Sequence, residues 1–504
     1  MWADLLVKTY DANYMGTQTD QPPTRVDSTR TPACQNMYSD PYGTIRKRDG
    51  KTVVNANAIT GASAVTGIYQ VNWDDLSSTI IASASNGAVY KEATGVFSEI
   101  ASGYYNGPEY YYSFVKLNNL AIWTNGYDTI KKWDGTTVSD LGGISTLFLR
   151  NLAVFKRRLW CFRGSTQPYL GYFSGLGDPE SWDLADDYLN FDTGDGDVVT
   201  NAVEHEDTIY VFKTRHVFRV FATGSVPPFA FDEISNTVGS PSGWAAQSTE
   251  AGLFFLGSDG IYKVSGNEIT NMSASIKNVF LGKSVSELPG LNTSRLQYAQ
   301  SGVEYSKKQF WVLCSTGPAQ QHDYAWVLDW QSGGLFPYTI AANTLGRINV
   351  SGRDKIYSGN YAGKIYKQDQ GTDDAGTAID GWYITPHLDL DDPESVKRLL
   401  YLVIHSKEIG RYFLEVYWKI DFARDWEGPA PVQMYGADEA FVGLDFIMGT
   451  SEVGVQDAIR GVVPINRRGR NIQFKFRNRG TEAVTIDKYT VLAQNVSVHV
   501  EAVT

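Results

Sequence analysis

Three aspartates in one short loop have the type and spacing to bind a metal ion. The run DTGDGD at 192–197 alternates oxygen-bearing side chains with turn formers. Carboxylate and hydroxyl oxygens suit Ca²⁺ or Mg²⁺, although the run lacks the ligand order and the bidentate Glu of an EF-hand loop. A plain loop between strands explains the same residues. We therefore expect no cofactor, and we keep Asp192, Asp195 and Asp197 as a candidate metal site.

Two basic clusters stand out in a chain whose net charge is −12. The first is Arg46, Lys47 and Arg48. The second gathers several cations in a short window without an intervening acid: Arg467, Arg468, Arg470, Lys475, Arg477 and Arg479. Such clusters could contact an acidic surface of a neighbouring subunit or the phosphates of DNA. A solvated face is the alternative.

The signatures of common enzymes are missing from the sequence. It holds no G-x-S-x-G elbow, P-loop, H-E-x-x-H or dinucleotide fingerprint. The histidines are scattered, and the spacing of His205 and His216 fits no metal-site template. Adjacent carboxylates such as Asp74 and Asp75 would point to opposite faces of a strand, so they do not make a glycosidase pair. We expect a protein without enzymatic activity.

Composition limits the kinds of fold that must position these residues. The chain has 504 residues, 48 of them glycine, and 13% aromatics, which favours turns and strands over an all-helical protein. Its length calls for two or more domains or one large closed β architecture. No apolar stretch is long enough to span a bilayer, and the N-terminus lacks signal-peptide features. Three widely spaced cysteines favour folding in a reducing cytoplasm.

A repeat dominates the middle of the chain. A turn ending in Gly precedes an aliphatic residue, an aromatic residue and Lys at 86–91, 259–263 and 362–367, and a related pattern occurs at 125–133. Asn-Gly and Asp-Gly turns favour hairpins, and another apolar strand precedes each turn. A period of about 40 to 45 residues is typical of four-stranded propeller blades. We predict an all-β fold with a six- or seven-bladed β-propeller at 45–375, in which 51–55 could complete the last blade and 273–294 is an insertion or short helix.

The two ends of the chain read differently from the repeat. Residues 1–44 are rich in proline and turn formers, which indicates an extended N-terminal arm, either disordered or docked on its own or a neighbouring subunit. After about residue 376 longer alternating strands appear, such as 472–477, in which every second residue is apolar. That alternation is typical of half-buried antiparallel strands. We predict a C-terminal β-sandwich-like domain at 376–504.

The order of these parts resembles a known family of proteins from tailed bacteriophages. The arm residues 36–38 and the strand at 43–50 are similar to the segment that precedes the blades in phage propeller proteins. The segment 272–280 is similar to a link between blades in the tail nozzle, or packaged-DNA stabilisation, proteins of short-tailed phages. The order of 385–397, Asp421, Trp426 and 470–480 is similar to related tail proteins. The resemblance covers nearly the whole chain and carries no catalytic residue.

The resemblance implies a structural protein of the virion tail, assembled in the host cytoplasm. Such a nozzle or hub forms a ring, usually a hexamer, below the portal and its adaptor ring. It retains packaged DNA, forms the channel for genome ejection and docks tail fibres or spikes. It has no membrane insertion. Two alternatives remain, namely a carbohydrate-binding tail fibre or receptor-binding protein, and a propeller glycosidase that acts on host surface glycan.

Overall fold

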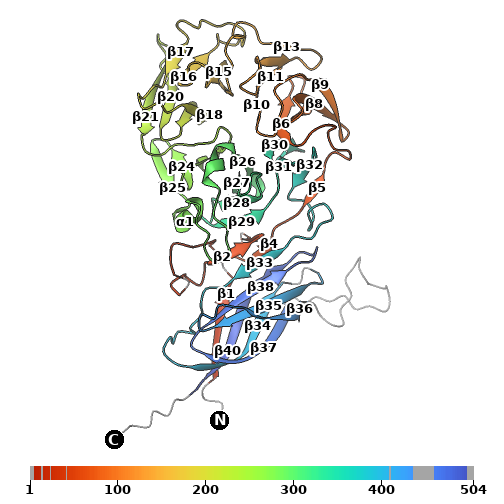
Figure 1. The fold of residues 1–504 in the computed structure, drawn as a ribbon, viewed down its shortest axis with the longest axis vertical. Helices are drawn as coiled ribbons and strands as arrows, with labels where there is room; N and C mark the ends of the chain where they lie inside the picture. The colour runs from red at the N-terminus through yellow and green to blue at the C-terminus, as the bar shows by residue number, and fades with distance from the viewer. Residues whose placement is uncertain are drawn as a thin grey trace.

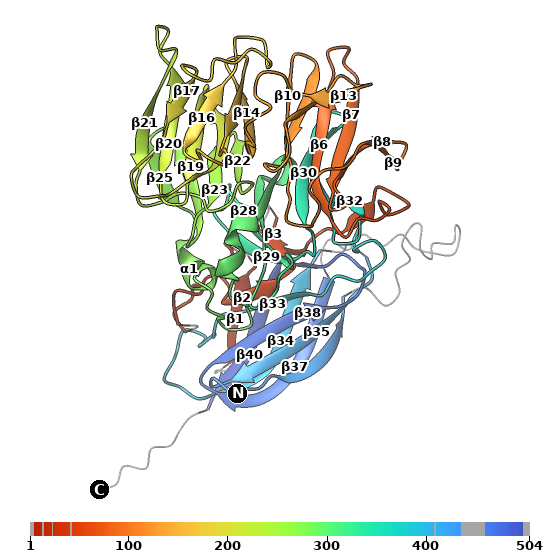
Figure 2. The ribbon, with the colours of Figure 1, turned by 45° about the horizontal axis from the view of Figure 1, so that its top comes forward.

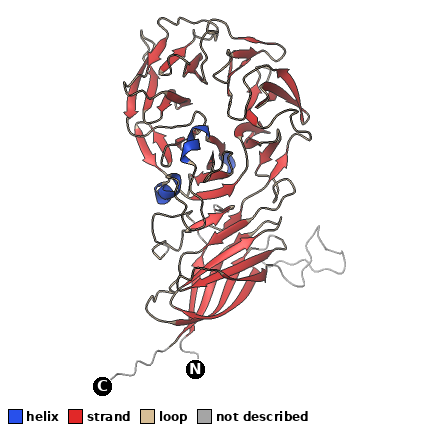
Figure 3. Ribbon diagram, viewed as in Figure 1, coloured by secondary structure: helices blue, strands red, loops and turns tan. Residues whose placement is uncertain are grey.

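The computed structural model describes residues 5–12, 15–22, 24–40, 43–407, 410–434 and 459–496. Within them the fold is all-β, with strands far outnumbering a few short helices (Figure 3). The chain forms a ring of sheets with a smaller β-sandwich beside it (Figure 1). None of the described helices is long or apolar enough to cross a membrane.

The ring consists of seven antiparallel sheets of four strands each, which we number as blades 1 to 7. Blade 1 consists of β6 (Val65–Asn72), β7 (Ser78–Ala84), β8 (Ala88–Ala93) and β9 (Val96–Ala101). Blade 2 consists of β10 (Ser113–Leu117), β11 (Leu120–Thr124), β12 (Lys131–Trp133) and β13 (Val138–Asp140). Blade 3 consists of β14 (Asn151–Phe155), β15 (Arg158–Phe162), β16 (Leu170–Phe173) and β17 (Tyr188–Asn190). Blade 4 consists of β18 (Val199–His205), β19 (Thr208–Lys213), β20 (Val217–Ala222) and β21 (Phe229–Ser235). Blade 5 consists of β22 (Ala246–Thr249), β23 (Gly252–Leu256), β24 (Ile261–Ser265) and β25 (Glu268–Asn271). Blade 6 consists of β26 (Gln300–Glu304), β27 (Gln309–Cys314), β28 (Tyr324–Asp329) and β29 (Leu335–Thr339).

Blade 7 combines the end of the repeat with a strand from before its beginning. It consists of β30 (Thr344–Val350), β31 (Arg353–Gly359), β32 (Ile365–Gln368) and β5 (Lys51–Val53). The first strands of successive blades contact one another around the ring, and β30 contacts β6, so the ring is closed. The predicted propeller is therefore confirmed, with seven blades and with residues 51–53 completing the last one.

Burial between blades explains why the repeat strands are apolar on both faces. Every residue of β23 and β27 is buried. Strands covered on both sides lose the alternation of a half-exposed sheet. The segment between blades 5 and 6 contains the short helices η1 (Ala274–Ile276), α1 (Lys277–Phe280) and η2 (Thr293–Tyr298), and η3 (Tyr305–Lys307) follows β26. Short helices thus occupy the place of the expected insertion.

The sandwich packs a four-stranded sheet against a five-stranded one. The first, in spatial order, is β1 (Leu5–Asp11), β40 (Lys488–Asn495), β34 (Lys397–Ser406) and β37 (Ile459–Gly469). The second is β2 (Ala33–Gln35), β33 (Gly381–Ile384), β38 (Ile472–Asn478), β35 (Phe413–Ile420) and β36 (Glu427–Gln433). In Figure 2 the sandwich lies beneath the ring, with β34 beside β37 in one sheet and β38 beside β35 in the other.

The N-terminal arm is extended and docks on its own chain. Its β1 pairs with β40 and its β2 pairs with β33, each along a sheet edge. A small third sheet joins β3 (Met37–Ser39) and β4 (Ile45–Lys47) to β39 (Thr485–Ile486). Paired edges leave fewer unsatisfied backbone groups, which explains how a segment rich in turn formers stays ordered.

One hydrophobic cluster spans the arm, blade 6 and the sandwich. It includes Tyr38 from the arm, Trp311 and Tyr338 from blade 6, and Phe474 and Phe476 from β38. The propeller and the sandwich therefore share buried apolar surface through the arm that lies between them.

Candidate functional site

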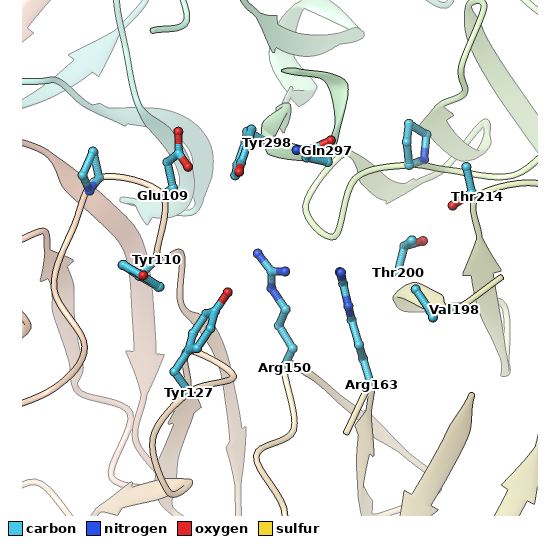
Figure 4. Close-up of a pocket in the computed structure, with 12 residues that line it drawn as sticks. Glu109, Tyr110, Tyr127, Arg150, Arg163, Val198, Thr200, Thr214, Gln297 and Tyr298 are labelled. Atoms are coloured by element: carbon cyan, nitrogen blue, oxygen red, sulfur yellow. The ribbon is translucent and has the colours of Figure 1, made fainter. Parts of the chain in front are cut away.

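A cavity of about 610 Å³ opens among the loops at one mouth of the propeller. Its walls come from the connections between blades and from the turns within blades 2, 3 and 4 (Figure 4). The lining residues are Pro108, Glu109, Tyr110, Tyr127, Arg150, Arg163, Val198, Thr200, Thr214, Pro241, Gln297 and Tyr298. A second cavity of about 370 Å³ shares Tyr127, Arg150, Arg163 and Val198 with it.

The hairpin of β14 and β15 places two arginines beside each other in this cavity. Asn151 pairs with Phe162, so Arg150 and Arg163 flank the last pair at the same end of the hairpin. The Arg150 backbone N–H donates to the Phe162 carbonyl at 2.9 Å, which fixes that end. Both side chains extend in the same direction into the cavity (Figure 4). Arg163 adopts a φ of 61°, a left-handed conformation uncommon for a residue other than glycine.

Neither guanidinium forms an ion pair with a carboxylate in the described part of the chain. Arg150 stacks on Trp244, with its Cζ 4.6 Å from the ring centroid, and its Nε is buried without a hydrogen-bond partner. Burial first, and then the charge of Arg150, lower the pKa of Arg163 to about 10. Burial also lowers the pKa of Arg150. Two like charges are thus held together at a cost in desolvation and repulsion.

The acid that lines the cavity is already paired. Glu109 Oε1 accepts from Nη1 of Arg295 at 2.5 Å. Arg295 in turn stacks on Tyr298, with its Cζ 4.2 Å from the ring centroid. Glu109 therefore neutralises a third arginine and leaves the charges of Arg150 and Arg163 uncompensated.

A cluster of three tyrosines forms one wall of the two cavities. The ring of Tyr127 lies 4.7 Å from that of Tyr110 and 5.3 Å from that of Tyr105, centroid to centroid. Tyr105 and Tyr127 stack on each other and are 54% and 43% exposed, so part of each side chain is accessible. The opposite wall supplies polar side chains from Thr214 and Gln297, whereas the buried Thr200 hydroxyl donates to the Ser240 carbonyl at 2.6 Å. Cationic, aromatic and hydrogen-bonding groups together suit a polar anionic ligand.

The candidate metal loop forms an ion-pair network. Asp195 and Asp197 lie with His216 in a group whose ligand atoms are within 4.8 Å of one another, and Asp192 is not part of it. Asp195 accepts from His216 Nε2 at 3.0 Å and from Arg215 Nη2 at 3.1 Å. Asp197 accepts from the backbone N–H of Arg215 at 3.0 Å. These donors use the oxygens that a cation would need, so the geometry does not favour a metal here.

The network favours the charged form of His216. Burial opposes the charged imidazole, but its hydrogen bonds to Glu233 and Asp195 outweigh burial and raise the pKa of His216. The hydrogen bonds from Thr193 and His216 in turn lower the pKa of Asp195. In its charged form His216 cannot be a metal ligand. Sequence spacing gave no sign of this contact, because His216 comes from the turn between β19 and β20, in the next blade.

The first basic cluster is largely buried within its own chain. Lys47 is 4% exposed and donates to Asn478 Oδ1 at 2.7 Å, and burial lowers the pKa of Lys47 to about 8. Arg48 is 3% exposed and forms a bidentate pair with Asp374, at 2.9 and 2.6 Å. Arg46 is half-buried in β4. The predicted subunit or DNA contact is therefore wrong for Lys47 and Arg48, because intramolecular partners enclose them.

The second basic cluster divides between two regions. Arg467, Arg468 and Arg470 are exposed at the end of β37 and just beyond it. Arg467 Nε pairs with Glu427 at 2.7 Å, and Arg470 Nε donates to the Glu394 carbonyl at 3.3 Å. Arg467, Arg468 and Arg470 are therefore separate from Arg477 and Arg479, which lie on or beside β38, although all five are close in sequence.

The remaining members of the second cluster lie on or beside β38. Arg477 forms a bidentate pair with Asp380, at 2.8 and 2.5 Å, whose hydrogen bonds raise the pKa of Arg477. Arg479 lies 3.7 Å from Glu415. Exposed Arg467, Arg468, Arg470 and Arg479 remain candidates for an intermolecular contact.

Sequence reasoning overlooked Arg150 and Arg163. Each stands immediately outside the apolar hairpin that runs from Asn151 to Phe162. A like-charged pair at the open end of a predicted hairpin, without a nearby acid, is a signal that could have identified them.

Comparisons with known proteins add no family. No protein-family model matches the sequence, and no curated protein does. Many solved structures are similar, and three of them illustrate the likeness. The WD40 β-propeller domain of Doa1 is 10% identical, with 63% of this chain and 96% of that chain covered and a TM-score of 0.38. BBS1N in complex with ARL6DN is 7% identical (65% and 99% covered, TM-score 0.43), and a glycoside hydrolase is 11% identical (90% and 100% covered, TM-score 0.28). All three TM-scores are below 0.5, so the propeller assignment depends on the strand pairing described above.

Proposed function

We propose that this protein is a structural component of a short-tailed phage tail, a nozzle or hub that assembles as a ring. The ring would retain packaged DNA and provide the channel for its ejection. In this role the protein would not be an enzyme. Its partners would be copies of the same chain, the portal and adaptor ring, and fibres or spikes.

The observation that supports a mechanical role is the continuity of the propeller with the sandwich. The arm contributes strands to both large sheets of the sandwich, and one core joins the arm, blade 6 and β38. Large, apolar interfaces between domains oppose relative movement. A closed propeller also lacks long free sheet edges. A rigid subunit of this kind suits an oligomeric ring that bears mechanical load during DNA packaging and ejection.

The net charge of −12 is compatible with a conduit for DNA. An acidic channel wall would repel phosphates, so DNA would slide past it without adhering. The proposal places this acidity on the lumen of the assembled ring. A basic lumen in an assembled particle would contradict this part of it.

The test is to measure the oligomeric state and the location of the full-length protein. We expect a ring of about six copies by mass photometry and negative-stain imaging, and antibody labelling at the tail of virions. A trimer labelled at distal fibres would favour the receptor-binding alternative. Release of oligosaccharides from purified host polysaccharide would favour the glycosidase alternative.

A further inference from the structure

We propose that the cavity at the propeller mouth binds an acidic saccharide. A carboxylate of the saccharide would lie between Arg150 and Arg163, and a sugar ring would pack against Tyr127. This inference goes beyond the proposed nozzle role, which needs no ligand in the propeller, and each can fail without the other.

The charge balance of the cavity argues for an anionic ligand. Buried and half-buried cations in proteins are normally paired, yet Arg150 and Arg163 have no carboxylate partner among the described residues, and Glu109 is committed to Arg295. Placing two guanidinium groups together does not stabilise the fold, because burial and repulsion both oppose it. A bound anion would offset both the repulsion and the desolvation.

Contact with Trp244 holds the Arg150 side chain in position for a ligand. Its planar group stacks on Trp244, which restricts its rotamers without using its donors. The hairpin fixes Arg163 beside it from the opposite strand. A carboxylate can accept hydrogen bonds from both guanidinium groups at once. Two lysine ammonium groups would lack this planar donor geometry.

The shape and the other walls favour a saccharide over a small inorganic anion. The two cavities, of about 610 and 370 Å³, share the arginines, so a ligand can extend to both sides of the anion position. Tyr105 and Tyr127 stack on each other and remain exposed, so the pair offers aromatic surface at the cavity wall. Exposed Thr214 and Gln297 add hydrogen-bonding groups suited to hydroxyls. Concave sites with aromatic walls and a few convergent polar groups are typical of ligand pockets.

The experiment measures binding to the full-length protein by isothermal titration calorimetry. The probe is a tetrasaccharide of alternating glucuronic acid and N-acetylglucosamine, and the matched ligand is its methyl ester, which lacks the negative charges. We expect the acid to bind with a Kd below about 1 mM and the ester to bind at least about tenfold more weakly. This comparison needs no protein variant, so it stands even if a variant folds poorly.

Two variants assign the binding to the arginine pair. Arg150→Gln and Arg163→Gln should each weaken binding of the acid about tenfold or more. The matched control is Arg157→Gln, an exposed arginine in the turn at the other end of the same hairpin, which should leave binding unchanged. Arg163→Gln should also keep or raise the melting temperature, because it removes a repelled charge that only the ligand compensates.

Several results would overturn the proposal. They are equal binding of the acid and its ester, no binding of the acid up to about 10 mM, or unchanged binding in both arginine variants. Inorganic sulfate that binds as tightly as the tetrasaccharide would reduce the site to one for small anions. Tighter arginine-dependent binding of a 12-base-pair duplex DNA would assign the cavity to nucleic acid instead.

Discussion

Individual charged residues in this protein act according to the partners that the fold gives them. Arg48 and Arg163 are the same residue type, yet Asp374 neutralises the first, whereas the second pairs with no acid among the residues that the structure describes. His216 is a third case, because two carboxylates overcome the cost of its burial. Residue type alone therefore does not separate a structural ion pair from a binding group.

The His216 network predicts a pH dependence of stability. The pKa of His216 is raised above 6.5 in the folded protein, so its contribution is fully present below pH 6.5 and is lost as the pH rises through the raised pKa. We expect the melting temperature of wild type relative to His216→Asn to fall as the pH increases above about 6.5.

A matched histidine tests the sign of that prediction. Burial lowers the pKa of His405, so the melting temperature of wild type relative to His405→Asn should rise as the pH approaches 6.5 from below. Thermal unfolding from pH 5 to 8 in all three proteins makes the comparison. Parallel curves for wild type and His216→Asn would contradict the role of the network.

The elements of the propeller depend on one another for closure. Six blades are made from consecutive strands, whereas blade 7 needs β5 from the N-terminal side of the repeat. Beyond the end of β5, Val54 N–H donates to the Ile365 carbonyl at 2.8 Å. Asn55 Oδ1 accepts from the backbone N–H of Ile365 at 2.7 Å, and its Nδ2 donates to the Gly363 carbonyl at 3.0 Å.

Asn55 therefore provides a test of ring closure. Asn55→Ala removes these two hydrogen bonds and a third, from Nδ2 to the Asn57 carbonyl at 2.8 Å. It leaves the buried N–H of Ile365 without that acceptor, which should cost about 1–3 kcal/mol. The control is Asn57→Ala, an exposed asparagine two residues away, which should change stability by less than about 0.5 kcal/mol. Urea denaturation followed by tryptophan fluorescence measures both. Equal effects would mean that the side chain of Asn55 does not hold the closure.

At the scale of the molecule, Arg48 connects the arm, the propeller and the sandwich. Its Nε donates to Asn36 in the arm at 2.9 Å, and Nη2 donates to the Thr339 carbonyl in blade 6 at 3.2 Å. Its bidentate partner, Asp374, lies in the link from blade 7 to the sandwich. One buried side chain thus joins segments that are more than 300 residues apart.

Removing that connection should loosen the junction of the two parts. Arg48→Met leaves Asp374, only 19% exposed, without its cation, and breaking such a pair costs about 3–5 kcal/mol. We expect a lower melting temperature and faster proteolysis in the link 369–380. Arg468→Met, at an exposed arginine, is the control and should change neither. A junction that resists protease equally in both variants would refute this role.

The sequence by itself determined the architecture. Gly-containing turns and apolar strands recur with the period of a blade, and alternating strands follow them, so local geometry predicted a propeller and a sandwich. It left open six or seven blades, because the closing strand pairs across more than 300 residues. Only the tertiary structure decided which charges are satisfied. Arg48 and Asp374, Arg477 and Asp380, and the unpaired Arg150 and Arg163 depend on contacts between distant segments. Backbone patterns repeat locally along the chain, whereas the field at a side chain depends on every segment that folds around it.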